Sequence, residues 1–89
     1  MAVMTAVSRA VTLTASVATK IADANALRTS ILVTTGGSIN VGGADVTYAN
    51  GYPISTGQQL SISTTGAEAE LWAIGGAAYV VNTLEFKPL

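Results

Sequence analysis

Short runs of β-branched and apolar residues, separated by pairs of glycines, constrain the fold of this chain most. In the stretch 25–57, residues 30–34 are largely β-branched or apolar, and residues 38–41 alternate between polar and apolar side chains. Both patterns are typical of β-strands. Gly36-Gly37 and Gly42-Gly43 follow these runs, and we expect them to adopt positive φ in hairpin turns. The stretch therefore predicts consecutive strands joined by tight turns.

Strand patterns recur through the rest of the chain. Residues 28–35 give the strongest pattern, and we expect this strand to be covered on both faces. Residues 1–9 have no clean period and predict an extended arm that pairs with a neighbouring molecule. Other strands are expected at 11–18, 19–21, 38–41, 46–48, 60–63, 70–74 and 77–86, with a turn at 23–26 and a corner at 50–53.

These elements predict an all-β fold, a single small antiparallel β-sandwich or barrel-like domain of about 6–8 short strands. The 89 residues leave no room for a second core. The expected organisation is an N-terminal arm at residues 1–10 followed by the β-sandwich domain at residues 11–87.

The composition excludes most kinds of catalytic or metal site. The chain has no cysteine and no histidine, so the usual zinc sites, Cys–His dyads and Ser–His–Asp triads cannot form. Glu68 and Glu70 lie two residues apart and could hold a cation or act as paired glycosidase carboxylates. A solvated face beside a turn also explains them, and this is the interpretation that we favour. We therefore expect no enzyme, no catalytic residue, no metal and no cofactor.

Charged residues are scarce, at 10% of the chain with a net charge of −1. Four scattered cations cannot form the basic stripe that phosphate contacts require, so nucleic-acid binding is not expected. Soluble surfaces usually carry about 25–35% charged residues. We interpret this surface as one that meets other proteins; the alternative is a monomer kept soluble by hydroxyl and amide side chains. The apolar N-terminal segment 1–18 is interrupted by polar residues, so no membrane span is expected. No lysine or arginine precedes its apolar part, so no signal peptide is expected either, and we expect the protein to be made in the cytoplasm.

Aromatic residues are the remaining binding candidates. Tyr48 and Tyr52 flank the Asn50-Gly51 corner and are expected at the surface, where they could anchor a protein contact or stack on a sugar. Trp72 could do the same if exposed, but its apolar neighbours favour a position in the core.

The order of motifs along the chain resembles that of small structural proteins of tailed double-stranded DNA bacteriophages. Residues 24–33, ANALRTSILV, are similar to an A-N-x-x-R-x-S-hydrophobic opening. A glycine-rich turn and the strand INVGG follow, and then DVT, the corner GYPI, the strand start GQQL and the segment ELWA before a hydrophobic last strand. The resemblance runs from about Val11 to Phe86.

The proteins that this chain resembles are head decoration, or cement, proteins and, less often, pieces of head fibres or tails. The resemblance implies a non-catalytic virion protein, commonly a homotrimer, that binds the major capsid protein on the outer capsid surface and cross-links capsid subunits. The alternative is a receptor- or glycan-binding module of a head fibre or tail protein. The residues expected at capsid or subunit interfaces are Ala2, Val3, Met4, Val7, Arg9, Tyr48, Tyr52, Pro53 and Lys87.

Overall fold

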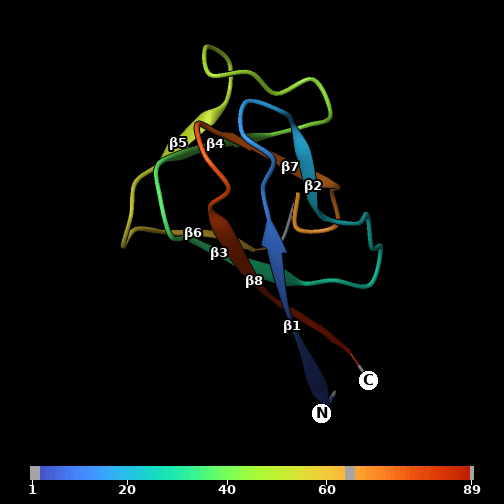
Figure 1. Ribbon diagram of the computed structural model, residues 1–89. Coiled ribbons are helices and arrows are strands. Elements are labelled where there is room, and N and C mark those ends of the chain that lie inside the picture. The colour runs from blue at the N-terminus through green and yellow to red at the C-terminus, as the bar shows by residue number, and fades with distance from the viewer. Residues whose placement is uncertain (1–2, 64–65, 89) are drawn as a thin grey trace.

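The computed structural model describes residues 3–63 and 66–88, and within these residues it contains eight strands and no helix. The strands form two four-stranded antiparallel sheets (Figure 1), which confirms the predicted all-β fold. Sheet A has the order β1-β8-β3-β6 and sheet B the order β2-β7-β4-β5, the connectivity of a jelly roll. The strand bounds are β1 Met4–Thr12, β2 Thr19–Ala22, β3 Ser30–Thr35, β4 Ile39–Gly42, β5 Tyr52–Ile54, β6 Gln59–Ser63, β7 Leu71–Gly75 and β8 Val80–Pro88.

The core lies between the two sheets and follows the period of two in each strand. Ile31, Val33 and Val81 of sheet A are fully buried against apolar side chains of sheet B such as Ile21 and Ile39. The opposite face of sheet A is left uncovered. Leu32, on that face of β3, is only half-buried, so the expectation that this strand is covered on both faces was wrong.

The glycine pairs do not form the expected hairpins. β3 and β4 belong to different sheets, so the chain crosses the sandwich at Gly36-Gly37 instead of turning back on itself. Neither this pair nor Gly42-Gly43 has positive φ. Close packing explains Gly37, because a Cβ there would lie 2.2 Å from Cε1 of the Tyr79 ring. Glycine is required at this position because a side chain has no room there, and not because the backbone adopts a left-handed conformation.

The segment expected to form a strand at 46–48 belongs instead to the loop between β4 and β5. Side chains of this loop replace strand pairing with local hydrogen bonds: the Thr47 N–H donates to Asn50 Oδ1 at 2.7 Å, and the Asn50 N–H donates to Thr47 Oγ1 at 3.2 Å. Val46 turns inward and is 4% exposed. The corner expected at 50–53 ends in the short strand β5, which pairs with β4.

The N-terminal segment is extended, and it pairs within its own chain. β1 lies antiparallel to β8 along its full length, from Met4 opposite Pro88 to Thr12 opposite Val80. The boundary expected after residue 10 therefore falls inside β1, and residues 13–18 form no strand. In Figure 1 the ends of β1 and β8 run out of the sandwich together, toward the two termini.

Candidate interaction surfaces

The predicted interface residues fall into two groups at opposite ends of the molecule (Figure 1). One group lies on the two-stranded ribbon of β1 and β8 near the termini. The other lies in the loop between β4 and β5 and at the start of β5. The molecule measures 43 × 21 × 18 Å, so the two groups are separate surfaces.

The ribbon surface combines apolar and basic side chains. Val3 is 64% exposed and Met4 is 44% exposed, whereas Val7 is half-buried on the inner side of the strand. Arg9 follows on that side, and its Nη1 lies 3.7 Å from Oδ2 of Asp23. Lys87 pairs with the β1 residue Thr5. Ala2, which was also predicted as a contact, lies outside the described residues.

The corner surface presents two tyrosines. Tyr48 is 50% exposed and Tyr52 is 62% exposed, as the sequence predicted. Loop packing fixes their spacing, because Gly51 lies where a Cβ would be 2.5 Å from the Asn40 Cβ and 3.0 Å from the Thr47 carbonyl oxygen. A small hollow opens beside this corner, lined by Tyr52, Pro53, Ile54, Gln58 and Gln59.

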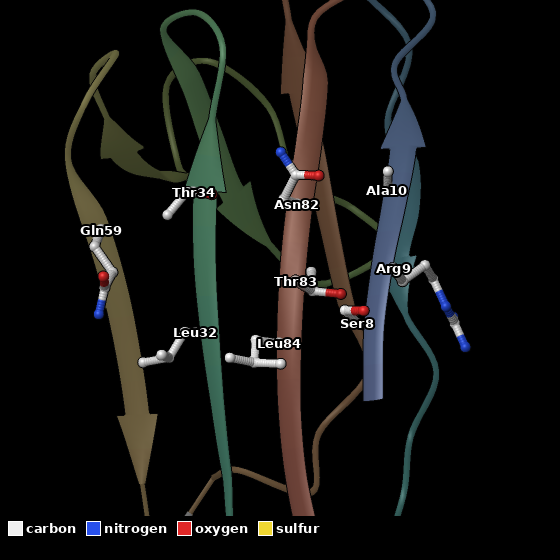
Figure 2. Close-up of a pocket in the computed structure, with 9 residues that line it drawn as sticks. All are labelled: Ser8, Arg9, Ala10, Leu32, Thr34, Gln59, Asn82, Thr83 and Leu84. Carbon is white, nitrogen blue, oxygen red and sulfur yellow. The ribbon is translucent and has the colours of Figure 1, made fainter. Parts of the chain in front are cut away.

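A shallow groove crosses the outer face of sheet A, and of the predicted interface residues that the structure describes only Arg9 lines it (Figure 2). Figure 2 shows β6, β3, β8 and β1 side by side, with Leu32 and Leu84 at the middle and Arg9 pointing away beyond β1. The sequence did not indicate this groove, because the pattern of β3 predicted a strand covered on both faces. Its lining residues are Ser8, Arg9, Ala10, Leu32, Thr34, Gln59, Asn82, Thr83 and Leu84.

A charged network surrounds the single tryptophan. Lys20 Nζ donates to Asp23 Oδ1 at 3.1 Å and lies 3.7 Å from Glu70 Oε2. The hydrogen bond from Lys20 and its positive charge lower the pKa of Asp23, and the same bond and charge of Asp23 raise the pKa of Lys20. Trp72 is half-buried; its Nε1 donates to Glu70, and Lys20 Nζ lies 5.9 Å from its ring centroid. Trp72 is thus neither a core residue nor an open stacking platform.

Arg28 is the buried polar centre that the sequence analysis did not identify. It is 3% exposed, and Nη1 forms an ion pair with Glu85 and donates to the Asp23 carbonyl at 2.9 Å. Its other nitrogens donate to the carbonyl oxygens of Ala67 and Ala69. Every contact is to a backbone carbonyl or to one carboxylate. The cluster therefore joins three parts of the chain, which are the β2–β3 loop, the segment that precedes β7, and the strand β8. It is structural in character.

Glu68 lies in a turn and Glu70 directly precedes β7, and both are exposed. Within residues 3–63 and 66–88, no group of three or more histidine, cysteine, aspartate or glutamate side chains is placed to hold a metal ion. The same residues include no helix long and apolar enough to cross a membrane.

Comparisons with known proteins bear on the fold alone. No protein-family model and no curated protein matches the chain. A similar solved structure is a chain from Bacillus endospore appendages, described as forming a novel family of disulfide-linked pili. It superposes with a TM-score of 0.57 at 18% sequence identity, over 98% of this chain and 88% of that one.

Proposed function

We propose that this chain is a non-catalytic decoration protein that binds the outer surface of a phage capsid and cross-links neighbouring capsid subunits. The observation that carries the proposal is the presence of exposed apolar side chains on two separate surfaces at opposite ends of one small domain. Cross-linking needs two separate contacts on one molecule, and the ribbon surface and the corner surface are separate contacts of this kind. The phage-like order of motifs and the scarcity of charge support the same function.

The stabilising mechanism is thermodynamic linkage. A protein that binds the intact shell and not the disrupted one raises the stability of the shell according to its concentration and affinity. Many copies, each with two modest contacts, act together because the second contact of each copy forms at high effective concentration. Contacts through Val3, Met4 and Tyr52 then suffice, although none of them fills a deep pocket.

The structurally similar chain comes from Bacillus endospore appendages that form pili. Those pili are described as disulfide-linked, whereas this chain contains no cysteine. We therefore propose that its assembly relies on non-covalent contacts, as expected for a protein added to a preformed shell.

The first experiment is to count the copies of this protein in each purified virion of the source phage by quantitative mass spectrometry. A decoration protein is expected in a fixed, high ratio to the major capsid protein, commonly as trimers. A few copies per particle would instead place the protein in the tail or a fibre. Its absence from the particle would contradict a virion role altogether.

A second experiment tests the two surfaces. Stripped capsids are incubated with the wild type, with Val3→Ser/Met4→Ser, or with Tyr52→Ser, and the temperature at which the capsids release DNA is recorded. Each variant is expected to lose most of the protection. Leu27→Ser is the matched control, because Leu27 is 66% exposed and belongs to neither surface. Equal protection by all four proteins would contradict the proposed contacts.

Glycan binding is a second candidate function, favoured by the hollow beside Tyr52. An exposed aromatic ring next to the amides of Gln58 and Gln59 combines a stacking surface with hydrogen-bond donors and acceptors. Saturable binding on a glycan array that is lost in Tyr52→Ala would support this function. An array without any signal would contradict it.

A further inference from the structure

Sheet B is protected at both of its edges. An open edge strand is a template for pairing with another chain, and proteins protect such edges with short strands, bulges, proline or charge. β5 has three residues, one of which is Pro53. β2 has four residues, and its register with β7 shifts after Lys20. Lys20 also places a charge on this edge, where it forms ion pairs with Asp23 and Glu70.

Sheet A lacks this protection at both of its edges, β6 and β1. β6 has five residues with neither a charge nor a proline, and its register with β3 is regular. β1 has nine residues and a regular register with β8. Its single charge, Arg9, forms an ion pair with Asp23 of the same chain. The two open edges of the molecule therefore belong to one sheet.

The hydrogen-bond pattern shows which backbone groups of β6 face outward. The Gly36 N–H donates to the Val80 carbonyl at 3.0 Å, in line with the register of β3 and β8. Antiparallel strands alternate between hydrogen-bonded and non-hydrogen-bonded pairs. Even-numbered residues of β3 therefore bond to β8 and odd-numbered ones to β6. It follows that Gln59 and Ser61 direct their N–H and C=O groups away from β3.

The same reasoning applies to β1. The Leu13 N–H donates to the Tyr79 carbonyl at 2.9 Å, so odd-numbered residues of β1 bond to β8. Ala6, Ser8 and Ala10 direct their N–H and C=O groups outward. Within the described part of the chain, these groups form no backbone hydrogen bond to another loop or strand.

The two edges are complementary in level and direction. The registers place Ser61 level with Leu32, Leu84 and Ser8 across the sheet (Figure 2). Each strand is antiparallel to its neighbour, so β6 runs opposite to β1. A second copy displaced sideways, without being turned over, brings its β1 antiparallel to β6. The outward groups of Ser61 then face those of Ser8 in the second copy, and the inner faces of both sheets stay on the same side.

We propose that copies of this chain associate head to tail, with β6 of one copy pairing with β1 of the next, so that sheet A continues from copy to copy. The occupant is a second copy because both halves of the contact are on this chain. A two-fold pair of β1 strands, or of β6 strands, would leave the other edge of each copy open. A head-to-tail contact closes into a ring or extends as a filament, depending on the rotation between copies. The inference is independent of the capsid function.

Proline substitutions at the outward-facing positions test the proposal in solution. Ser61→Pro and Ser8→Pro each remove one outward N–H while leaving the hydrogen bonds inside sheet A in place. The matched controls, Ser61→Ala and Ser8→Ala, remove the same hydroxyls and keep the N–H. The wild type and both alanine variants are expected to form concentration-dependent oligomers in sedimentation velocity, and each proline variant alone is expected to stay monomeric.

Mixing the two proline variants identifies the direction of the contact. Ser8→Pro retains an open β6 and Ser61→Pro an open β1, so the mixture is expected to form a dimer with one copy of each variant. A wild type that is monomeric up to its solubility limit would overturn the proposal. So would self-association of Ser61→Pro alone, which would indicate pairing between two β1 strands.

Hydrogen exchange of the wild type gives a readout that does not depend on the folding of the variants. The amides of Ser8 and Ser61 are expected to gain protection as the protein concentration rises. The amide of Leu27, which donates to Asn25 Oδ1 within its own loop, serves as an internal reference and is expected to stay unchanged. Unchanged exchange at Ser8 and Ser61 would overturn the proposal even if a proline variant failed to fold.

Discussion

At the scale of single residues, the stability of this protein depends strongly on the buried ion pair of Arg28 and Glu85, because each charge is buried and needs its partner. We expect Arg28→Met to lower the free energy of unfolding by about 3–5 kcal/mol, because it leaves Glu85 buried without its ion-pair partner and removes the donor to the carbonyls of Ala67 and Ala69. Urea unfolding followed by Trp72 fluorescence measures the effect.

Two further variants separate the loss of the buried pair from the loss of any cation. Arg9→Met removes an arginine whose side chain is 44% exposed and is expected to change stability by less than about 0.5 kcal/mol. Arg28→Met/Glu85→Leu is expected to be more stable than Arg28→Met alone, since no unpaired carboxylate remains buried. An Arg28→Met protein as stable as Arg9→Met would contradict the structural role of this cluster.

Thr83 offers the opposite change, a gain in stability. Its side chain points into the core and is 3% exposed, and its Oγ1 has no hydrogen-bond partner among the described residues. Thr83→Val keeps the shape and removes the unpaired hydroxyl, so we expect it to raise the free energy of unfolding by about 1 kcal/mol. Thr34→Val, on the exposed face of β3, is the control and is expected to be neutral. A destabilised Thr83→Val would show that the hydroxyl is satisfied.

The burial of Arg28 and Thr83 could not be predicted from the sequence. Arg28 is one of four scattered cations, and its partners Ala67, Ala69 and Glu85 lie 39 to 57 positions away along the chain. The exposure of Tyr48 and Tyr52 was predictable, because polar residues and a glycine surround them locally. The exposure of a residue can be predicted from the sequence when its neighbours in the chain determine it. It cannot be predicted when a segment that is distant in the sequence determines it.

At the scale of elements, the strand patterns in the sequence located β3, β4, β6, β7 and β8. The loops were harder to predict. A glycine in a sequence indicates a turn, but the sequence does not show whether the backbone there needs positive φ or whether a side chain has no room. In this chain the described glycines with positive φ are Gly57 and Gly66, whereas Gly37 and Gly51 lie where a neighbouring group excludes a Cβ.

The loop between β4 and β5 provides the test of this distinction. Gly51→Ala places a methyl group against the Asn40 Cβ and the Thr47 carbonyl, so we expect it to destabilise the protein by about 1–3 kcal/mol. Gly76→Ala is the matched control, because nothing lies within 4 Å of its Cβ position and its φ is not positive. It is expected to be neutral or to stabilise by up to about 1 kcal/mol. Thermal unfolding compares the two, and equal melting temperatures would contradict the packing argument.

At the scale of the whole molecule, the pairing of the first strand with the last determines the architecture. The sequence indicated a sandwich of antiparallel strands, but nothing local to the N-terminal segment or β8 shows that the two pair with each other. Without that pairing, the N-terminal segment reads as a free arm. Because the segment pairs with β8, it is the edge strand β1 of sheet A. A partner of this segment would therefore contact it as a further strand added to that edge.

The position of β8 leads to the last prediction. β8 is the final strand of the chain, yet it lies between β1 and β3, so sheet A has no continuous ladder until the C-terminal residues are in place. Truncation after Thr83 removes half of β8 together with Glu85, the partner of Arg28. We expect this variant to lack cooperative unfolding in urea and near-ultraviolet circular dichroism. A chain that begins at Met4 loses no strand residue, and it is expected to unfold cooperatively at nearly the wild-type midpoint. Cooperative unfolding of the variant truncated after Thr83 would mean that sheet B and β3 form a stable core without β8, contrary to the central position of that strand.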